Sequence, residues 1–311
     1  MSTLLFPGQG SQVIGMGQEF YSNFEFVKKI FKEADAKLGY PISKIILEGP
    51  ENELQLTKNT QPAILTVSYS IFKVLKEEFN FDLNKYKYIA GHSLGEYSAL
   101  VCAEALDFGD ALYLLHERGK AMQDAVPIGN GLMIAVLGLK TEEIKKLIDK
   151  SDNIPGVCEI ANDNADGQVI VSGDKASVTS FQNILKEKKI KTIPLKVSAP
   201  FHCSMMKPAA EKMKEKILNT KFTTPKIKII NNVTARAEDD SVKIKNLLVD
   251  QIFSTVRWRE SLINMSKNGV KIFVEIGPGK ALTGMVKRTI KEANCFSINS
   301  IADIKNSHDR L

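Results

Sequence analysis

The chain has 311 residues, 43% of them hydrophobic and 25% charged, a balance that predicts a globular protein and excludes the disordered and fibrous classes. Its formal net charge of +6 comes from lysines on expected helices that also carry glutamates. This mild basic excess alone does not indicate nucleic-acid binding, which is disfavoured because the sequence has no recognisable nucleic-acid reader motif. No apolar run approaches the roughly 20 residues of a membrane span and no secretory signal is apparent, so we expect a cytoplasmic protein that does not enter membranes.

The first 127 residues alternate strand-like and helix-like patterns. Short apolar runs that end in glycine predict buried strands, and apolar residues at helical spacing predict surface helices. Pro62 suits the first turn of a helix that begins near residue 60. In chain order we expect a strand at 3–6, helices at 18–38 and 60–79, a strand at 86–90, a tight turn at 91–95, and helices at 96–106 and 110–125.

Between Pro127 and Pro200 the pattern changes to that of a compact unit. Its expected elements are a strand at 132–137, a helix at 141–150, strands at 157–161 and 168–172, a helix at 175–188 and a strand at 192–197. This βαββαβ order is typical of the ferredoxin-like unit. We therefore predict an inserted ferredoxin-like subdomain at 128–197.

After the insertion, helices and strands alternate again. The expected elements are a helix at 207–218, a strand at 226–231, a helix at 247–268, a strand at 271–275 and a helix at 281–291. Strands separated by helices predict a parallel sheet. The predicted fold is thus α/β, with a large hydrolase-like parallel-sheet core formed by residues 1–127 and 198–311.

Residues 91–95, Gly-His-Ser-Leu-Gly, fit the turn that carries a serine nucleophile, with an apolar strand before it and an apolar helix after it. Small residues on both sides of Ser93 allow a strained turn that exposes its hydroxyl. Free N–H groups at the start of the helix favour an oxyanion, and the backbone N–H of Leu94 is the expected donor. The alternative is that Ser93 merely caps an ordinary helix.

A serine nucleophile needs a general base, and the chain has four histidines. His308 lies in a polar tail and His116 in the middle of a helix. His92 is next to Ser93 in an extended turn, so its side chain should point away. His202 lies in a loop between a predicted strand and a helix, which makes it the candidate base, although local hydrogen bonds alone could also explain it.

Other polar residues stay ambiguous on pattern alone. Arg118 in a predicted helix is by default a surface residue paired with a neighbour. Gln12, after the first strand, could simply cap the next helix. The four cysteines are far apart and form no Cys-x-x-Cys pair, which predicts free thiols and no metal site.

Taken together, these segments resemble the malonyl-CoA:acyl carrier protein transacylases of fatty acid synthesis and the related acyltransferase domains of polyketide synthases. The resemblance covers nearly the whole chain, in family order. Its anchors are residues 6–12, 91–96, 118–123, 164–169, 198–206, 231–233, 251–258 and 275–279.

The resemblance implies a ping-pong transfer in which Ser93 attacks malonyl-CoA, His202 takes its proton, and the phosphopantetheine thiol of acyl carrier protein receives the malonyl group. The backbone N–H groups of Gln12 and Leu94 would hold the oxyanion, and Arg118 would bind the malonyl carboxylate. A backbone carbonyl near Gln251 would orient the histidine. Coenzyme A thioester is then a substrate, and no cofactor or metal is implied.

Phe201, immediately before the histidine, matches family members that prefer malonyl over methylmalonyl groups, and Leu94 points the same way. One methyl group is worth only about 1–3 kcal/mol in such a pocket, so the selectivity should be incomplete. We expect a monomer whose acidic carrier-protein partner binds at a basic surface. A chain without flanking domains favours fatty acid synthesis, by resemblance.

Two other functions remain open at this stage. The first is a serine hydrolase or thioesterase, because an acyl-serine is hydrolysed wherever water reaches it. The second is a non-catalytic module that binds an acidic partner through lysines such as Lys186, Lys188 and Lys189.

Overall fold

The computed structural model describes residues 1–151, 154–195, 197 and 199–307. Lys196, within the strand expected at 192–197, lies outside the described residues. So do Ser198, at the start of the 198–206 anchor, and His308.

The larger part of the molecule is built on a six-stranded sheet with the order β10-β9-β1-β2-β7-β8. Its first five strands in that order are parallel, and the short β8 pairs antiparallel at the edge. The strands are β1 Ser2–Phe6, β2 Tyr86–Gly91, β7 Ile229–Ile230, β8 Ala237–Glu238, β9 Ile272–Ile276 and β10 Asn294–Ile298. The parallel-sheet core expected from the alternating pattern is therefore present.

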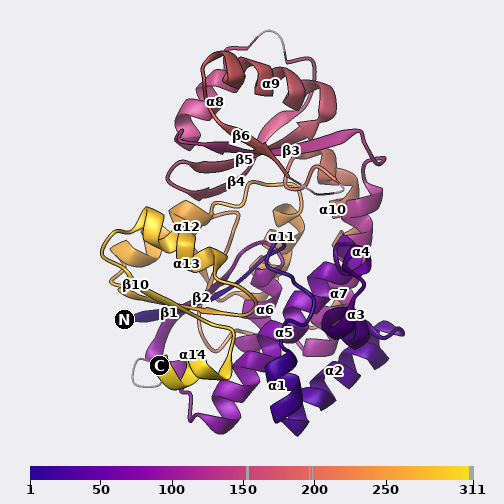
Figure 1. Cartoon of the computed structure of the whole chain (residues 1–311), viewed down its shortest axis with the longest axis vertical. Helices are drawn as coiled ribbons and strands as arrows, with labels where there is room; N and C mark the ends of the chain where they lie inside the picture. The colour runs from indigo at the N-terminus through magenta and orange to yellow at the C-terminus, as the bar shows by residue number, and fades with distance from the viewer. Residues whose placement is uncertain (152–153, 196, 198, 308–311) are drawn as a thin grey trace.

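Helices cover both faces of this sheet, because successive side chains of a strand point to opposite faces. Leu4 and Phe6 of β1 pack into one cluster with α5, α6 and α7, whereas Leu5 packs into another with α12 and α13. Figure 1 shows these two groups of helices on either side of β1 and β2. The helices of this part are α1 Gln18–Asn23, α2 Glu25–Leu38, α3 Ile42–Glu48, α4 Glu51–Leu54, α5 Thr57–Glu78, α6 Gly95–Cys102, α7 Phe108–Asp124, α10 Lys207–Asn219, α11 Ser241–Gln251, α12 Trp258–Lys267, α13 Ala281–Thr289 and α14 Ile301–Ser307. Short 3₁₀ turns occur at Leu83–Lys85 and Ser204–Met206.

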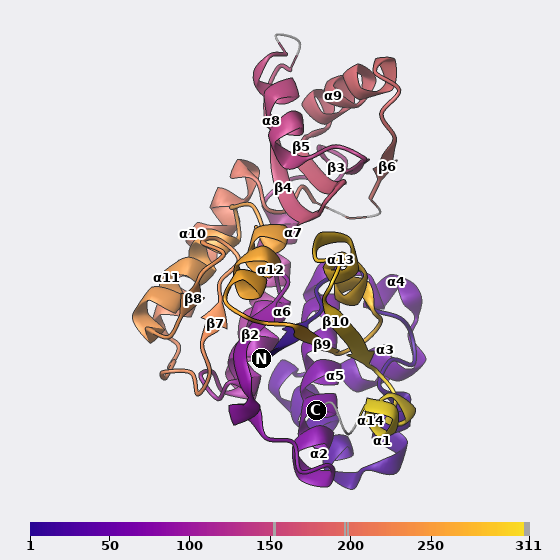
Figure 2. The same cartoon turned by 90° about the vertical axis from the view of Figure 1, so that its left-hand side faces the viewer.

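Residues 131–194, in the middle of the sequence, form a second, smaller sheet with two helices. Its elements are β3 Gly131–Leu137, α8 Thr141–Asp149, β4 Cys158–Ala165, β5 Gln168–Asp174, α9 Lys175–Glu187 and β6 Thr192–Pro194. The strands are antiparallel in the order β4-β5-β3-β6, and they share a separate apolar cluster with α8 and α9. Figures 1 and 2 show this unit standing at one end of the larger one, with its sheet facing the core.

The expected helix at 247–268 is wrong. The chain instead forms α11 and α12, separated by residues 252–257. The break allows Val256 to bond to the small sheet, its N–H donating to the Ala161 carbonyl at 2.8 Å and its carbonyl accepting from the Asp163 N–H at 3.0 Å. A tertiary contact that no local pattern encodes has replaced the helical hydrogen bonds.

Smaller differences concern the ends of elements. The helix expected at 18–38 is divided at Phe24, which is extended (φ −128°). Pro62 lies in the second turn of α5, because that helix begins at Thr57. The strand expected at 226–231 is reduced to β7, and α3, α4, β10 and α14 were not anticipated. In the part of the chain that the structure describes, no helix combines the length and the hydropathy of a membrane span.

Candidate active site

The turn between β2 and α6 is shaped by its glycines. A Cβ on Gly91 would lie 1.8 Å from the Gly95 carbonyl oxygen, and one on Gly95 would lie 2.3 Å from the Phe6 carbonyl oxygen. Ser93 between them has a left-handed backbone (φ 53°), which a non-glycine residue adopts only at an energetic cost. The chain thus makes the strained strand–turn–helix that lifts the Ser93 hydroxyl at the carboxyl end of the sheet.

His202 lies directly against this hydroxyl, with its Nε2 2.8 Å from Ser93 Oγ. Its Nδ1 is 2.9 Å from the carbonyl oxygen of Gln251. A carbonyl oxygen can only accept, so Nδ1 carries the proton and Nε2 presents a lone pair to the serine. Burial, reinforced by the Arg118 cation, lowers the pKa of His202 to about 3. The imidazole is therefore neutral, the form that a general base requires.

Arg118 of α7 is not a surface residue, since its side chain is 1% exposed. Its Nη2 lies 3.2 Å from Ser93 Oγ and 2.9 Å from the Gln251 side-chain oxygen, and its Nη1 lies 2.7 Å from that of Gln61. Its Nε is buried without a hydrogen-bond partner, and no ion pair joins it to a carboxylate of the described residues. A buried guanidinium beside the nucleophile, with donors to spare, is equipped to bind an anionic substrate group.

Two expected oxyanion donors border the same cavity. Gln12 and Leu94 both line it, and within the described ranges neither backbone N–H donates to another protein group. The Gln12 side chain is held by the N–H of Gly10 at 2.7 Å and by its own donation to Gln55 at 2.6 Å. The two amide groups are thus available to a ligand.

The cavity that holds Ser93 has a volume of about 530 Å³. Phe201, 6% exposed, forms part of its wall together with Met122, Met133 and Leu195. The lining combines these apolar side chains with polar ones such as Gln55 and Asn162, which suits a polar acyl group on a longer chain.

Several residues that hold this site were not singled out from the sequence, although three of them fall in anchors of the resemblance. The side-chain oxygen of Asn232 accepts from the Ser93 N–H at 2.7 Å, and its Nδ2 donates to the Gly91 carbonyl at 2.8 Å. Glu96 is fully buried beneath the turn. His92 Nε2 contacts the Asn164 side-chain oxygen at 2.8 Å. Nothing in the sequence pattern could have assigned a position to Gln61, which contacts Arg118.

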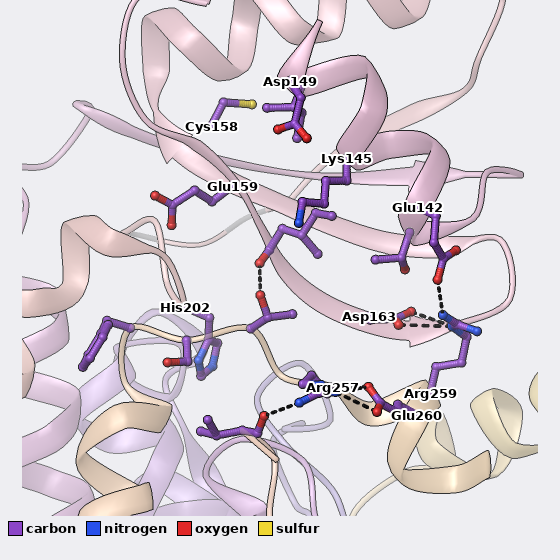
Figure 3. A pocket seen from close by; sticks show the side chains of 17 residues that line it. Glu142, Lys145, Asp149, Cys158, Glu159, Asp163, His202, Arg257, Arg259 and Glu260 are labelled. Carbon is purple, nitrogen blue, oxygen red and sulfur yellow. Dashed lines mark hydrogen bonds and ion pairs between the residues drawn. The ribbon is translucent and has the colours of Figure 1, made fainter. Parts of the chain in front are cut away.

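A second cavity, of about 650 Å³, lies between α8, β4 and the start of α12 (Figure 3). His202 borders it, but Ser93 does not. Arg259 donates to both carboxylate oxygens of Asp163, at 2.9 and 3.1 Å, and Arg257 is bound to Glu260. Both arginines are thus paired with carboxylates of the same cavity, and the candidate active site is the smaller cavity because it contains Ser93.

The remaining groups that could have suggested another function are metal ligands, a cysteine and a group of lysines. No cluster of three or more metal-ligating side chains occurs among the described residues. Cys203 is buried beside His202, and burial raises the pKa of its thiol to about 11, so it is not a competing nucleophile. Lys186, Lys188 and Lys189 are exposed at and just after the end of α9, and none of them lines the cavity that contains Ser93.

Comparisons with known proteins all identify acyltransferases as the proteins to which this chain is similar. The acyl transferase domain family matches residues 3–310. A malonyl CoA-acyl carrier protein transacylase of Haemophilus influenzae is 43% identical over 96% of this chain and 95% of its own length. The crystal structure of an acyl-carrier-protein-S-malonyltransferase from Bartonella henselae is similar with a TM-score of 0.96 and 39% identity, covering 99% of this chain and 98% of that one. A malonyl-transacylase solved with its type II polyketide synthase acyl-carrier protein gives a TM-score of 0.95 and 37% identity, covering 100% of this chain and 99% of that one.

Proposed function

The chain belongs to the acyl transferase family and is an acyltransferase, and from that premise we propose that it transfers a malonyl group from malonyl-CoA to acyl carrier protein through an ester on Ser93. The observation that carries this proposal is the meeting of three side chains. Ser93 Oγ is 2.8 Å from the base His202 and 3.2 Å from the Arg118 guanidinium. A nucleophile, a neutral base and an anion-binding cation converge on one atom.

In the first half-reaction, His202 Nε2 takes the proton of Ser93 Oγ while the oxygen attacks the thioester carbonyl of malonyl-CoA. The N–H groups of Gln12 and Leu94 stabilise the resulting oxyanion. Collapse of the tetrahedral intermediate breaks the C–S bond, and the imidazolium returns its proton to the departing coenzyme A thiolate. The products are malonyl-Ser93 and free coenzyme A.

The second half-reaction repeats these steps in reverse order with a different thiol. His202 takes the proton of the phosphopantetheine thiol, its sulfur attacks the ester carbonyl, and Ser93 leaves as the hydroxyl after recovering the proton. Throughout, the Gln251 carbonyl holds Nδ1 and stabilises the imidazolium, so no carboxylate partner is needed. The coenzyme A thioester is a substrate and free coenzyme A a product, and the chemistry needs no cofactor.

Arg118 supplies the preference for a dicarboxylic acyl group. In the free protein its Nε lacks a partner and its Nη groups bind neutral amide oxygens, so a malonyl carboxylate would form its first direct ion pair. Phe201 would border the α-carbon and disfavour a methyl branch.

We further propose that residues 128–197 form a ferredoxin-like subdomain inserted into a core of residues 1–127 and 198–311. The element order βαββαβ and the strand order β4-β5-β3-β6 support this division. Carrier protein as the partner is supported by a relative solved in complex with its acyl-carrier protein, whereas its binding at a basic surface stays a prediction. A role in fatty acid synthesis, a monomeric state and a cytoplasmic location stay predictions.

The experiment is to expose the protein to malonyl-CoA and measure its mass, with and without carrier protein. We expect a malonyl adduct that is absent in Ser93→Ala and that is discharged when carrier protein is added. A protein that forms no adduct would be a binding module. Acylation of Ser93 alone releases one coenzyme A per protein molecule, so fast, repeated turnover of malonyl-CoA without carrier protein would instead identify a thioesterase.

A further inference from the structure

A buried carboxylate lies beneath the nucleophile turn, and the proposed reaction gives it no chemical step. Glu96 is 0% exposed and sits in the first turn of α6, behind Ser93. Its Oε1 accepts from Asn231 Nδ2 at 2.6 Å, and its Oε2 accepts from the Asn232 N–H at 3.1 Å and from Gln251 Nε2 at 2.8 Å. Burying a carboxylate is costly, so three donors converging on one indicate a function.

All three partners are donors, and two of them cannot turn. The Asn232 donor is a backbone N–H. The Asn231 side chain is fixed because its oxygen accepts from the N–H groups of Val233 at 2.8 Å and Thr234 at 3.2 Å. Only the Gln251 amide can rotate, and its orientation therefore depends on Glu96.

The Gln251 amide connects Glu96 to the reaction centre. Its Nε2 donates to Glu96 and to the Ser93 carbonyl at 3.1 Å, while its Oε1 accepts from Arg118 Nη2 at 2.9 Å. If the amide turned over, an NH₂ group would face the Arg118 guanidinium and an oxygen would face the Ser93 carbonyl. Both contacts would become repulsive, and Arg118 would shift from its position beside Ser93 Oγ.

We infer that Glu96 is a positioning residue for malonyl transfer: as an ionised carboxylate it orients the Gln251 amide, which in turn holds Arg118 in place for the malonyl carboxylate. This inference rests on the proposed function. Glu96 touches neither the substrate nor the reacting atoms, and it acts through Gln251.

The inference has a pH signature. Burial is the largest effect on the Glu96 carboxyl and raises its pKa to about 7, although its three hydrogen bonds and the Arg118 cation oppose this. The charged or titratable groups that act on or respond to it are Arg118 of α7 and Tyr97 of α6; its partners from the residue 231–232 turn and from α11 are neutral amides. Protonation puts an O–H among fixed donors and turns the Gln251 amide. His202, with its pKa of about 3, stays neutral over the same range.

The test uses the first half-reaction, in which no acceptor thiol titrates. The rate of Ser93 acylation is measured by rapid quenching and mass spectrometry, from pH 6 to 8, with malonyl-CoA and with acetyl-CoA. In the unaltered protein we expect malonylation to slow by about tenfold between pH 8 and 6, and acetylation to change much less. Glu96→Gln imitates the protonated side chain, and should lower malonylation at pH 8 by roughly tenfold or more while removing its pH dependence.

Glu275→Gln is the matched control. Glu275 is equally buried and accepts from the backbone N–H groups of Leu282 and Thr283, and among the described residues its side-chain hydrogen bonds do not involve Gln251 or Arg118. It should leave both the malonyl-to-acetyl ratio and the pH profile unchanged. Glu96→Asp keeps the negative charge, so its malonylation should still slow between pH 8 and pH 6, even if its rate at pH 8 is lower than that of the unaltered protein.

The outcomes separate the two proposals. If the unaltered protein forms no malonyl-Ser93, the proposed function fails. If it does, and Glu96→Gln lowers malonylation and acetylation equally or keeps the same acid limb, Glu96 is only structural and the inference is overturned. Acetylation in each variant also reports whether the site is folded.

Discussion

Replacing Arg118 with methionine separates its role in binding from its role in stability. Methionine keeps an unbranched side chain that fills part of the same space, but it removes the positive charge. Removing a buried cation relieves the cost of its desolvation, whereas the Gln61 and Gln251 oxygens would each lose a donor at about 1–3 kcal/mol. These effects oppose each other, so the free energy of unfolding should fall by less than the roughly 6 kcal/mol that the two unpaired oxygens could cost together.

Malonyl transfer responds very differently in the same variant. A substrate carboxylate buried without its cation costs about 3–5 kcal/mol, which corresponds to roughly two to almost four powers of ten in kcat/KM. Acetyl transfer has no carboxylate to bind and should fall by less than about tenfold. Arg259→Met is the control, since it removes an arginine that is bound to Asp163 in the second cavity. Equal losses for malonyl and acetyl groups in Arg118→Met would refute the carboxylate role.

Two other predictions follow from burial at the site. Because the folded-state pKa of His202 is about 3 against an ordinary 6.5, the folded protein binds fewer protons than the unfolded chain between these values and loses stability as the pH falls below 6.5. His202→Gln escapes this loss, so urea unfolding at pH 7.5 and at pH 5 should show the variant gaining about 2 kcal/mol relative to the unaltered protein, and an unchanged gap would count against a buried neutral imidazole. Phe201→Ser should reduce discrimination against methylmalonyl-CoA by about tenfold or more, measured as the ratio of kcat/KM values, and an unchanged ratio would show that the ring does not border the α-carbon.

The arrangement of strands followed from local patterns because a parallel sheet buried on both faces needs uninterrupted apolar runs. The strands expected at 3–6 and 271–275 contain such runs, at 4–6 and 272–274, and both are central strands of the sheet. Segments with weaker apolar patterns were missed or misjudged. The strand Asn294–Ile298 begins with polar residues and lies at the edge of the sheet, where one side needs no partner.

Some residues of the candidate site could be predicted from local sequence patterns and others could not. Ser93 and His202 could be proposed because the nucleophile turn has a recognisable shape and the chain offers few histidines. Arg118 could not be separated from an ordinary surface arginine by its helix alone, since its burial depends on α5 packing against α7. Gln61 and Glu96 belong to a hydrogen-bond network drawn from the four helices α5, α6, α7 and α11, and such a network has no local signal.

The one long helix that the pattern predicted and the chain does not form is the most informative difference. In a continuous helix the Gln251 carbonyl would accept from the N–H four residues later, and it would not be free for His202. Because α11 ends at Gln251, this carbonyl is among the last four of the helix, which have no intrahelical donor. It accepts from His202 Nδ1 at 2.9 Å instead, while Val256 bonds to the small sheet. Local preference and the needs of the site conflict here, and the same break fixes the tautomer of the base and joins the two sheets around it.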